Sequence, residues 1–293
     1  GKELQVSTFD REKLTFTRLA ASPTLDLLRG MSGGIGVWLD ANDRLHVYFA
    51  VPDGNALRND QKHHAATYLP YDGAGFWRGN IPRLALYHAA FDSIQMGSLN
   101  GLARVSDGPG EFLFALGGMA VLNLGADHPP GLAAVDQLST FRYFPLDPET
   151  GAPGRMQFID SPHGVALRHP VIGANLKAIP DPQTGLSNLI VCDTCRAWQY
   201  RFSGEWTPDG GPIFLGPKPL TGEGVHLTLG SLCVISPGDM DRDGLIDLMV
   251  GNDAGHLLFV RNVGTPQSAA FDLPVVPLVG GKPLDIKAGY SLS

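Results

Sequence analysis

Short apolar runs that end at turn residues recur along the chain. The run at residues 34–39 (GIGVWL) is followed by Asp40-Ala41-Asn42-Asp43, a combination typical of a strand closed by a turn. Similar apolar runs stand at residues 189–191, 198–200, 248–250 and 257–260. Helical periodicity is nearly absent, and only residues 130–137 favour a short helix. The pattern therefore predicts an all-β protein.

An internal repeat refines this prediction. Residues 185–201 align without a gap with residues 244–260, and each copy reads as turn, strand, four-residue turn and strand. Weaker copies begin near Asp40 and Asp107. Units of about sixty residues that each form a four-stranded antiparallel sheet are typical of propeller blades. We expect a β-propeller of about four such blades, near residues 32–93, 98–160, 168–221 and 229–276.

Strand-like segments also precede and follow these blades, at residues 14–19 and 286–293. A ring of blades must close to remove its exposed edges, and this leaves two arrangements open. The chain is part of a larger ring of about six to eight blades, or it closes as a five-bladed ring with a partial last blade. We expect the first arrangement.

One motif carries specific metal chemistry. Residues 239–247 read Asp-Met-Asp-Arg-Asp-Gly-Leu-Ile-Asp. Carboxylates at alternate positions can converge on one hard cation, and the glycine permits the sharp turn that folds them inward. An EF-hand would carry Glu at loop position twelve, where this chain has Val250. The motif predicts a calcium site between strands, and the alternative is a solvated acidic turn. The predicted calcium ligands are Asp239, Asp241, Asp243, Asp247 and the carbonyl of Leu245.

The segments after the acidic loop extend the match. Together with the loop, they resemble the FG-GAP/VCBS repeat family at residues 248–252 (LMVGN) and 255–265 (GHLLFVRNVGT). The resemblance is strong over residues 229–276, fair over residues 168–221 and weak before them. It implies calcium-binding propeller blades in an exported protein, located outside the cell or in the periplasm.

The other repeats depart from the family pattern in this loop. At the same offset Pro180, Pro182 and Thr184 replace the loop carboxylates, and Asn188 replaces the last Asp. The turn at residues 40–43 lacks the glycine. We therefore expect one well-formed calcium site, on a scaffold that does not by itself determine a function.

The three cysteines suggest a second metal site. Cys192 and Cys195 form a C-x-x-C in the turn after a predicted strand, and Cys233 leads into the next blade. Three thiolates and one imidazole would make a closed tetrahedral zinc site between two blades. A disulfide or free thiols are the alternatives. The predicted zinc ligands are Cys192, Cys195, Cys233 and His226, with His256 as a rival for the imidazole.

Histidines and tyrosines gather at residues 63–71 (HHAATYLPY). Some propeller-type polysaccharide lyases, including those that act on ulvan, use His/Tyr acid–base pairs, and this stretch is similar to them in residue type. β-Elimination from a uronate chain needs a base and a cationic group that neutralises the carboxylate. The candidate lyase residues are His63, His64, Tyr68, Tyr71, Arg155 and Arg168.

Composition limits the remaining classes of function. The 293 residues carry 22 Lys and Arg against 29 Asp and Glu, a net charge of −7 without a basic cluster, which argues against a nucleic-acid partner. No run reaches the roughly eighteen apolar residues of a membrane span. Residues 1–5 lack a signal core, so we expect any export signal to have been removed or to lie outside this sequence. Two hypotheses stay open: a scaffold that binds polysaccharide or protein, and a polysaccharide lyase.

Overall fold

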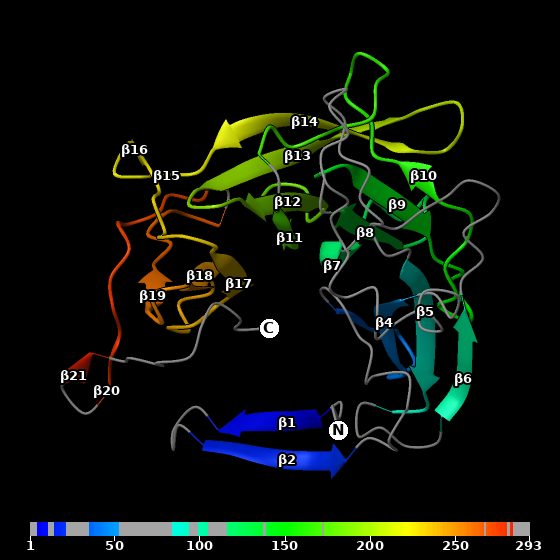
Figure 1. Ribbon diagram of the computed structural model, residues 1–293, viewed down its shortest axis with the longest axis horizontal. Coiled ribbons are helices and arrows are strands. Elements are labelled where there is room, and N and C mark those ends of the chain that lie inside the picture. The colour runs from blue at the N-terminus through cyan, green and yellow to red at the C-terminus, as the bar shows by residue number, and fades with distance from the viewer. Residues whose placement is uncertain are drawn as a thin grey trace, which may run out of the picture. The chain divides into compact units, whose positions relative to one another are not determined.

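Antiparallel strands form all the regular structure of the described residues (Figure 1). The computed structural model describes residues 5–10, 15–21, 35–52, 84–93, 99–104, 116–136, 139–171, 173–266, 268–279 and 282–283. Among these residues no helix is long and apolar enough to span a membrane. The chain divides into two compact units, which are residues 1–116 with 147–155, and residues 117–146 with 156–293.

The first unit contains a hairpin and a four-stranded sheet. The hairpin pairs β1 (Gln5–Asp10) with β2 (Thr15–Ala21). In the sheet, the strands are neighbours in chain order: β3 (Gly36–Leu39), β4 (Leu45–Pro52), β5 (Leu84–Phe91) and β6 (Leu99–Arg104). Residues 45–50 of β4 are all buried, as expected of a central strand with apolar side chains on both faces.

The second unit contains three larger sheets. The first orders β7 (Leu116–Leu122), β8 (Gly131–Asp136), β9 (Phe141–Pro145) and β10 (Gln157–Phe158). The second orders β11 (Asn175–Pro180), β12 (Ser187–Cys192), β13 (Ala197–Trp206) and β14 (Pro212–Pro219). The third orders β17 (Val234–Gly238), β18 (Asp247–Gly251) and β19 (Leu257–Val260).

Short segments complete the second unit. The β-bridges Phe259–Val275 and Asn262–Phe271 place the chain after β19 back alongside it, where a fourth strand of this sheet would lie. One small hairpin pairs β15 (Thr221–Gly222) with β16 (Val225–His226), and another pairs β20 (Leu278–Val279) with β21 (Lys282–Pro283). Each sheet is therefore an up-and-down meander of adjacent strands.

Sheet β11–β14 presents an apolar face on each side because side chains alternate along its strands. Leu189 and Val191 of β12 belong to one buried cluster with residues of β7 to β9. Ile190, between them, belongs to a second cluster with residues of β17 to β19. In Figure 1, β7, β11 and β17 lie closest together within this unit, and β10, β14 and β19 lie outward. This is the radial order of propeller blades.

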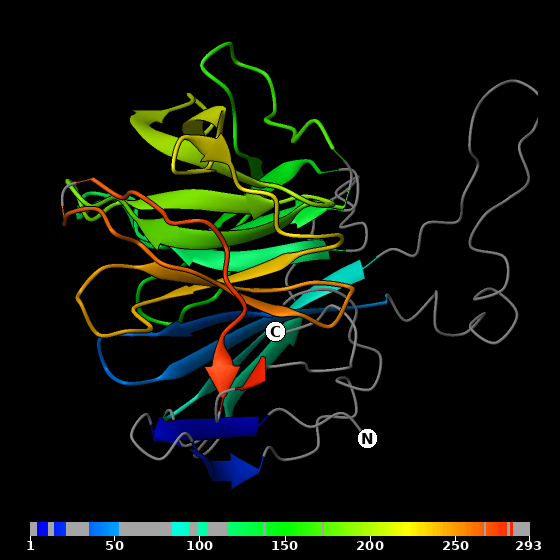
Figure 2. The same cartoon turned by 90° about the vertical axis from the view of Figure 1, so that its left-hand side faces the viewer.

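These observations confirm an all-β protein of four-stranded antiparallel blades. Figure 2 shows the strands of the second unit lengthwise, with their turns gathered at the two ends. The expected helix at residues 130–137 is wrong, because residues 131–136 form β8 and every one of them is buried. A strand buried on both faces shows no alternation and so cannot be told from a helix by periodicity.

The predicted blade limits also differ in one place. Strand β6 completes the first sheet by pairing with β5, although residues from 98 onward were expected to begin the second blade. The fourth predicted blade, near residues 229–276, coincides with sheet β17–β19 and its bridged segment. The copy expected near Asp107 and the strand expected at residues 286–293 lie outside the described residues.

Candidate metal centre

The acidic loop connects β17 to β18 and is folded by its own carboxylates. Gly244 has φ +86°, a left-handed conformation that favours glycine. Its N–H donates to Asp239 Oδ2 at 3.2 Å. The N–H of Asp243 donates to Asp241 Oδ1 at 3.3 Å, and the N–H of Leu245 donates to Asp243 Oδ1 at 2.9 Å. The turn that the sequence predicted at this glycine is therefore present.

Asp247, the first residue of β18, is fully buried and held on both oxygens. Its Oδ1 accepts the N–H of Asn262 at 2.8 Å, and its Oδ2 accepts the N–H of Met240 at 3.0 Å. A buried carboxylate needs such donors because its desolvation is costly. These two bonds fix the carboxylate at the base of the loop.

Three carboxylates converge at this point. Asp239, Asp241 and Asp247 each place one oxygen within 4.8 Å of the others. The Oδ1 atom of Asp239 is buried and has no hydrogen-bond partner in the described part of the chain. Three clustered carboxylates, one of which has a buried oxygen without a partner, fit a hard cation, which prefers oxygen ligands. These residues thus fit the predicted calcium ion.

Arg261, just after β19, neutralises the other side of the loop. Its Nε lies 2.6 Å from Asp241 Oδ2, and its guanidinium lies 3.5 Å from Asp243 Oδ2. Asp243 thus faces Arg261 and the N–H of Leu245, and it does not join the cluster of three. The structure brings together three of the predicted ligands and places Asp243 beside them, while Leu245 contributes its N–H to the loop.

The equivalent position in the preceding sheet is satisfied without a metal. Asn188 stands where Asp247 stands in the repeat, and its amide donates to Asp181 Oδ2 at 3.0 Å. Its Oδ1 accepts the N–H of Phe202 at 3.0 Å. The amide of Asn188 thus gives Asp181 a neutral hydrogen-bond donor at the position where the acidic loop has a further carboxylate.

The cysteines are paired differently from the zinc hypothesis. Cys192 and Cys233 form a disulfide, and Cys195 is a free, half-buried thiol. The Nε2 of His226 lies 2.9 Å from the carbonyl oxygen of Ala197. The cysteine turn does contact the segment that enters the next sheet, as expected, since Thr194 accepts the N–H of Leu232.

This pairing corresponds to the disulfide alternative. Oxidised Cys192 and Cys233 offer no thiolate, so the geometry does not support the zinc site, which stays a prediction. His256, the rival ligand, is exposed in the turn before β19. Among the described residues, the three aspartates of the acidic loop form the only group of three or more metal-ligating side chains.

A buried polar network that the sequence did not reveal lies beside the cysteine turn. The Nδ1 of His169 is 2.7 Å from Tyr200 Oη, and its Nε2 is 3.4 Å from Asp193 Oδ2. The indole of Trp198 donates to the same Asp193 oxygen at 2.6 Å. Burial lowers the pKa of His169, and Asp193 opposes this effect. His169 and Asp193 are both buried, so the network fixes a turn and offers no open catalytic group.

A comparable network occupies the first unit. The Nδ1 of His46 is 3.0 Å from His88 Nε2, and its Nε2 is 3.3 Å from Asp40 Oδ2. Burial, together with the adjacent His46, lowers the pKa of His88 to about 4. Burial alone would raise the pKa of Asp40, but donors led by Arg44 outweigh it and lower that pKa to about 2. Both histidines are buried.

Side chains of one type close the hairpin turns in both units. An Asp or Asn at the start of the turn accepts an N–H on its far side. The pairs are Asp136 with Thr140 at 2.9 Å, Asp193 with Arg196 at 2.8 Å, Asn252 with His256 at 3.2 Å and, in the first unit, Asp40 with Arg44 at 2.9 Å. These local bonds are a common property of Asx side chains in turns.

The lyase candidates are only partly described. His63, His64, Tyr68 and Tyr71 lie outside the described residues. Arg155 is exposed in the first unit. Arg168 is exposed in the second unit, and its Nε lies 3.2 Å from Thr140 Oγ1. The described residues therefore do not assemble the predicted acid–base site.

Comparisons with known proteins give only distant likenesses. No family model matches the chain, and no curated protein matches it. One similar solved structure is a GH43_1 enzyme from Xanthomonas citri complexed with xylotriose, at 11% identity and a TM-score of 0.43, covering 97% of this chain and 81% of that chain. Another is a family 43 arabinoxylan arabinofuranohydrolase from Bacillus subtilis, at 10% identity and a TM-score of 0.45, covering 90% of this chain and 56% of that chain.

Likenesses of this size carry no argument about the chain. The blade assignment rests instead on the strand order of the sheets and on the two apolar clusters that flank sheet β11–β14. The relation to FG-GAP/VCBS repeats remains a resemblance of sequence, strongest in the residues that build the acidic loop.

Proposed function

We propose that this chain is an exported, calcium-binding propeller protein of FG-GAP/VCBS type that acts as a scaffold for contacts with carbohydrate or protein. One observation carries the proposal: the carboxylates of Asp239, Asp241 and Asp247 converge, and an oxygen of Asp239 is buried there without a partner. The family resemblance, which is strongest in the same loop, also supports it.

Charge repulsion gives the physical reason for a cation. Two carboxylates about 4 Å apart near a protein surface repel by about 4 kcal/mol at an effective dielectric constant of about 20. Arg261 offsets this at Asp241, but no described cation pairs with Asp239 or Asp247. A bound calcium ion would supply the missing charge and link the end of β17 to the start of β18.

The disulfide supports the proposed location outside the cell or in the periplasm. Disulfides form and persist in oxidising compartments and are rare in the reducing cytosol. The Cys192–Cys233 disulfide links β12 to the segment that enters β17. Both cysteines lie in the buried apolar cluster that contains Ile190, where the disulfide stabilises the fold and is shielded from thiol–disulfide exchange.

Calorimetric titration and thermal melting test the calcium proposal. We expect one bound calcium per chain, and a free-ligand concentration one hundred times the dissociation constant should stabilise the fold by about 2.7 kcal/mol. Asp239→Asn removes one charge at the unpartnered oxygen and should weaken calcium binding at least about tenfold, roughly 1.4 kcal/mol. Asp253→Asn is the matched control, because Asp253 is exposed in the turn at the other end of the same sheet.

Two outcomes would contradict the proposal. One is an unchanged melting temperature in chelator together with no heat of calcium binding. The other is equal weakening by Asp239→Asn and Asp253→Asn, which would reduce the effect to general surface charge.

A second assay separates the scaffold from the lyase alternative. The protein is incubated with alginate, ulvan and pectin while ultraviolet absorbance is followed for the unsaturated product. A binding scaffold leaves the absorbance flat and is retarded in an affinity gel that contains its polysaccharide. A rising absorbance would instead favour the lyase and direct mutagenesis to His63 and His64.

A further inference from the structure

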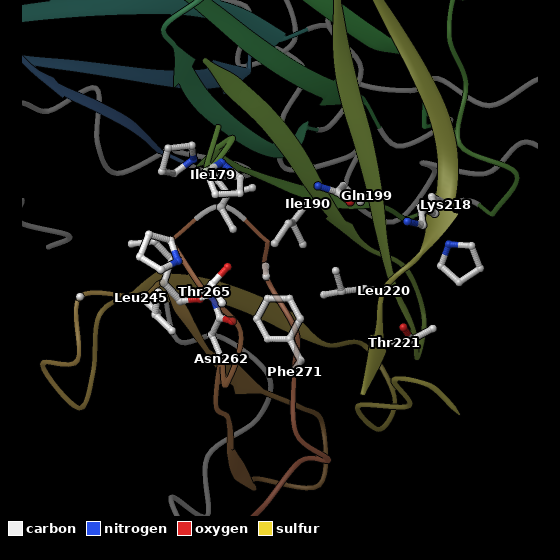
Figure 3. A pocket seen from close by; sticks show the side chains of 17 residues that line it. Ile179, Ile190, Gln199, Lys218, Leu220, Thr221, Leu245, Asn262, Thr265 and Phe271 are labelled. Carbon is white, nitrogen blue, oxygen red and sulfur yellow. Dashed lines mark hydrogen bonds between the residues drawn. The ribbon is translucent and has the colours of Figure 1, made fainter. Parts of the chain in front are cut away.

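A cleft of about 340 Å³ lies in the second unit between sheet β11–β14 and the segments that flank sheet β17–β19 (Figure 3). Its lining includes residues 244–246 of the acidic loop on one side and residues 218–221 on the other. This volume is at the small end of the range in which proteins bind small molecules. The cleft is distinct from the carboxylate cluster, since no Asp or Glu lines it.

The floor of the cleft is apolar. Ile179, Ile190, Leu220 and Phe271 line it, and each is at least nine-tenths buried in the cluster between the two sheets. Figure 3 shows the Phe271 ring between the walls. Displacing water from such a surface favours an apolar ligand body by about 25 cal/mol for each Å² buried.

Polar groups stand mainly on one wall. Gln199 of β13 and Lys218 of β14 are paired neighbours in the sheet, and Thr221 follows on β15. Figure 3 shows Gln199 and Lys218 across the cleft from Leu245 and Asn262. The Asn262 side chain is already engaged, because its amide donates to the carbonyl of Ile246 at 3.2 Å.

Lys218 determines the charge preference. It is the only charged residue in the lining, and it makes no ion pair within the described part of the chain. Gln199 adds an amide and Thr221 a hydroxyl, and neither side chain is hydrogen-bonded to another described residue. A ligand here would meet one positive charge and two neutral donors on one wall, an apolar floor, and Asn262 and Thr265 among the apolar side chains of the other wall.

We infer that this cleft binds a small amphipathic monoanion, with its apolar body on the Ile190–Leu220–Phe271 floor and its carboxylate toward Lys218. A free sugar fits less well, because its many hydroxyl groups need more partners than this wall offers. No carboxylate of the acidic loop lines the cleft, although residues 244–246 of that loop do.

Three matched probes test the inference by ligand-observed NMR titration: phenylbutyrate, phenylbutanol and phenylbutylamine. They share one apolar body and differ in charge. We expect phenylbutyrate to bind about two- to fivefold more tightly than phenylbutanol, the range of a solvent-exposed ion pair, and phenylbutylamine to bind most weakly. Lys218→Met keeps the side-chain stem and should abolish the preference for the acid over the alcohol.

Two further variants complete the test. Lys282→Met removes an exposed lysine that does not line the cleft and should leave the preference intact. Ala269→Phe adds bulk at a lining position and should weaken the acid and the alcohol alike. Equal affinities for the three probes, a preference that survives Lys218→Met, or unchanged binding in a folded Ala269→Phe variant would each overturn the inference.

Discussion

Removing the Cys192–Cys233 disulfide should lower stability by a calculable amount. The two cysteines are 41 residues apart and connect the end of β12 to the residue before β17. In the loop-entropy description, a cross-link over a loop of this length restricts the unfolded chain by about 4 kcal/mol. Both cysteines are buried in the packed cluster between two sheets, so we expect reduction to change the folded state little beside this entropic effect.

Melting and thiol titration measure this effect together. At about 2 °C per kcal/mol for a domain of this size, reduction should lower the melting temperature by about 8 °C. Unfolded protein without reductant should show one titratable thiol, that of Cys195, and three after reduction. The double variant Cys192→Ala/Cys233→Ala should melt near the reduced protein, with or without reductant.

Cys195→Ser is the control for this experiment. It leaves the disulfide in place and should retain the full reductant-dependent shift. Three thiols before reduction, together with one equivalent of zinc in freshly purified protein, would refute the disulfide and restore the tetrahedral zinc site. A reductant effect that persists in the double variant would show that the loop-entropy reasoning fails.

Three further predictions follow from buried side chains and one strained turn. The pKa of His88 is lowered from 6.5 to about 4 in the folded protein, so below pH 6.5 the unfolded state binds more protons than the folded state. Urea melts should therefore show that up to about 3 kcal/mol of stability is lost as the pH falls from 6.5 to 4. Gly151→Ala should destabilise by more than about 1 kcal/mol, because φ is +68° and the new Cβ would lie against the His46 ring, whereas Gly164→Ala, with φ +71° and open space, isolates the backbone effect alone. Trp198→Phe removes the indole donor to its buried carboxylate and should lower the free energy of unfolding by about 1.5–3 kcal/mol; an unchanged urea midpoint would contradict the role given to that bond.

The strands and the acidic loop could be predicted because their signals are local. Alternating apolar runs and turn residues fix a hairpin within about ten residues, and Gly244 marks its turn by a conformation that other residues avoid. The repeat at an offset of 59 residues predicted a four-residue turn after the strand at residues 189–191, and residues 193–196 form a turn between β12 and β13. The helix predicted at residues 130–137 was wrong because the strand at residues 131–136 is buried on both faces, and this burial depends on the neighbouring sheets.

The sequence alone could not identify contacts between residues that are distant along the chain. Three cysteines permit several pairings, and only the packing of β12 against the segment before β17 selects Cys192 with Cys233. The His169 and His46 networks combine residues from separate strands and turns, so no spacing announces them. For local turns, by contrast, the sequence held a further signal: the motif Asp-Pro-x-Thr-Gly occurs at residues 147–151 and again at residues 181–185. In each copy the Asp accepts two N–H groups of its own turn.

The hairpin turns that are closed by an Asp or Asn side chain have an evolutionary implication. Each bend is secured by a side chain only three or four positions away, so an exchange elsewhere in the protein leaves its geometry intact. Individual blades can then diverge at their own pace while retaining their shape. Such autonomy explains how one blade can keep an acidic loop suited to a metal while its neighbour has replaced the same loop with prolines and an amide.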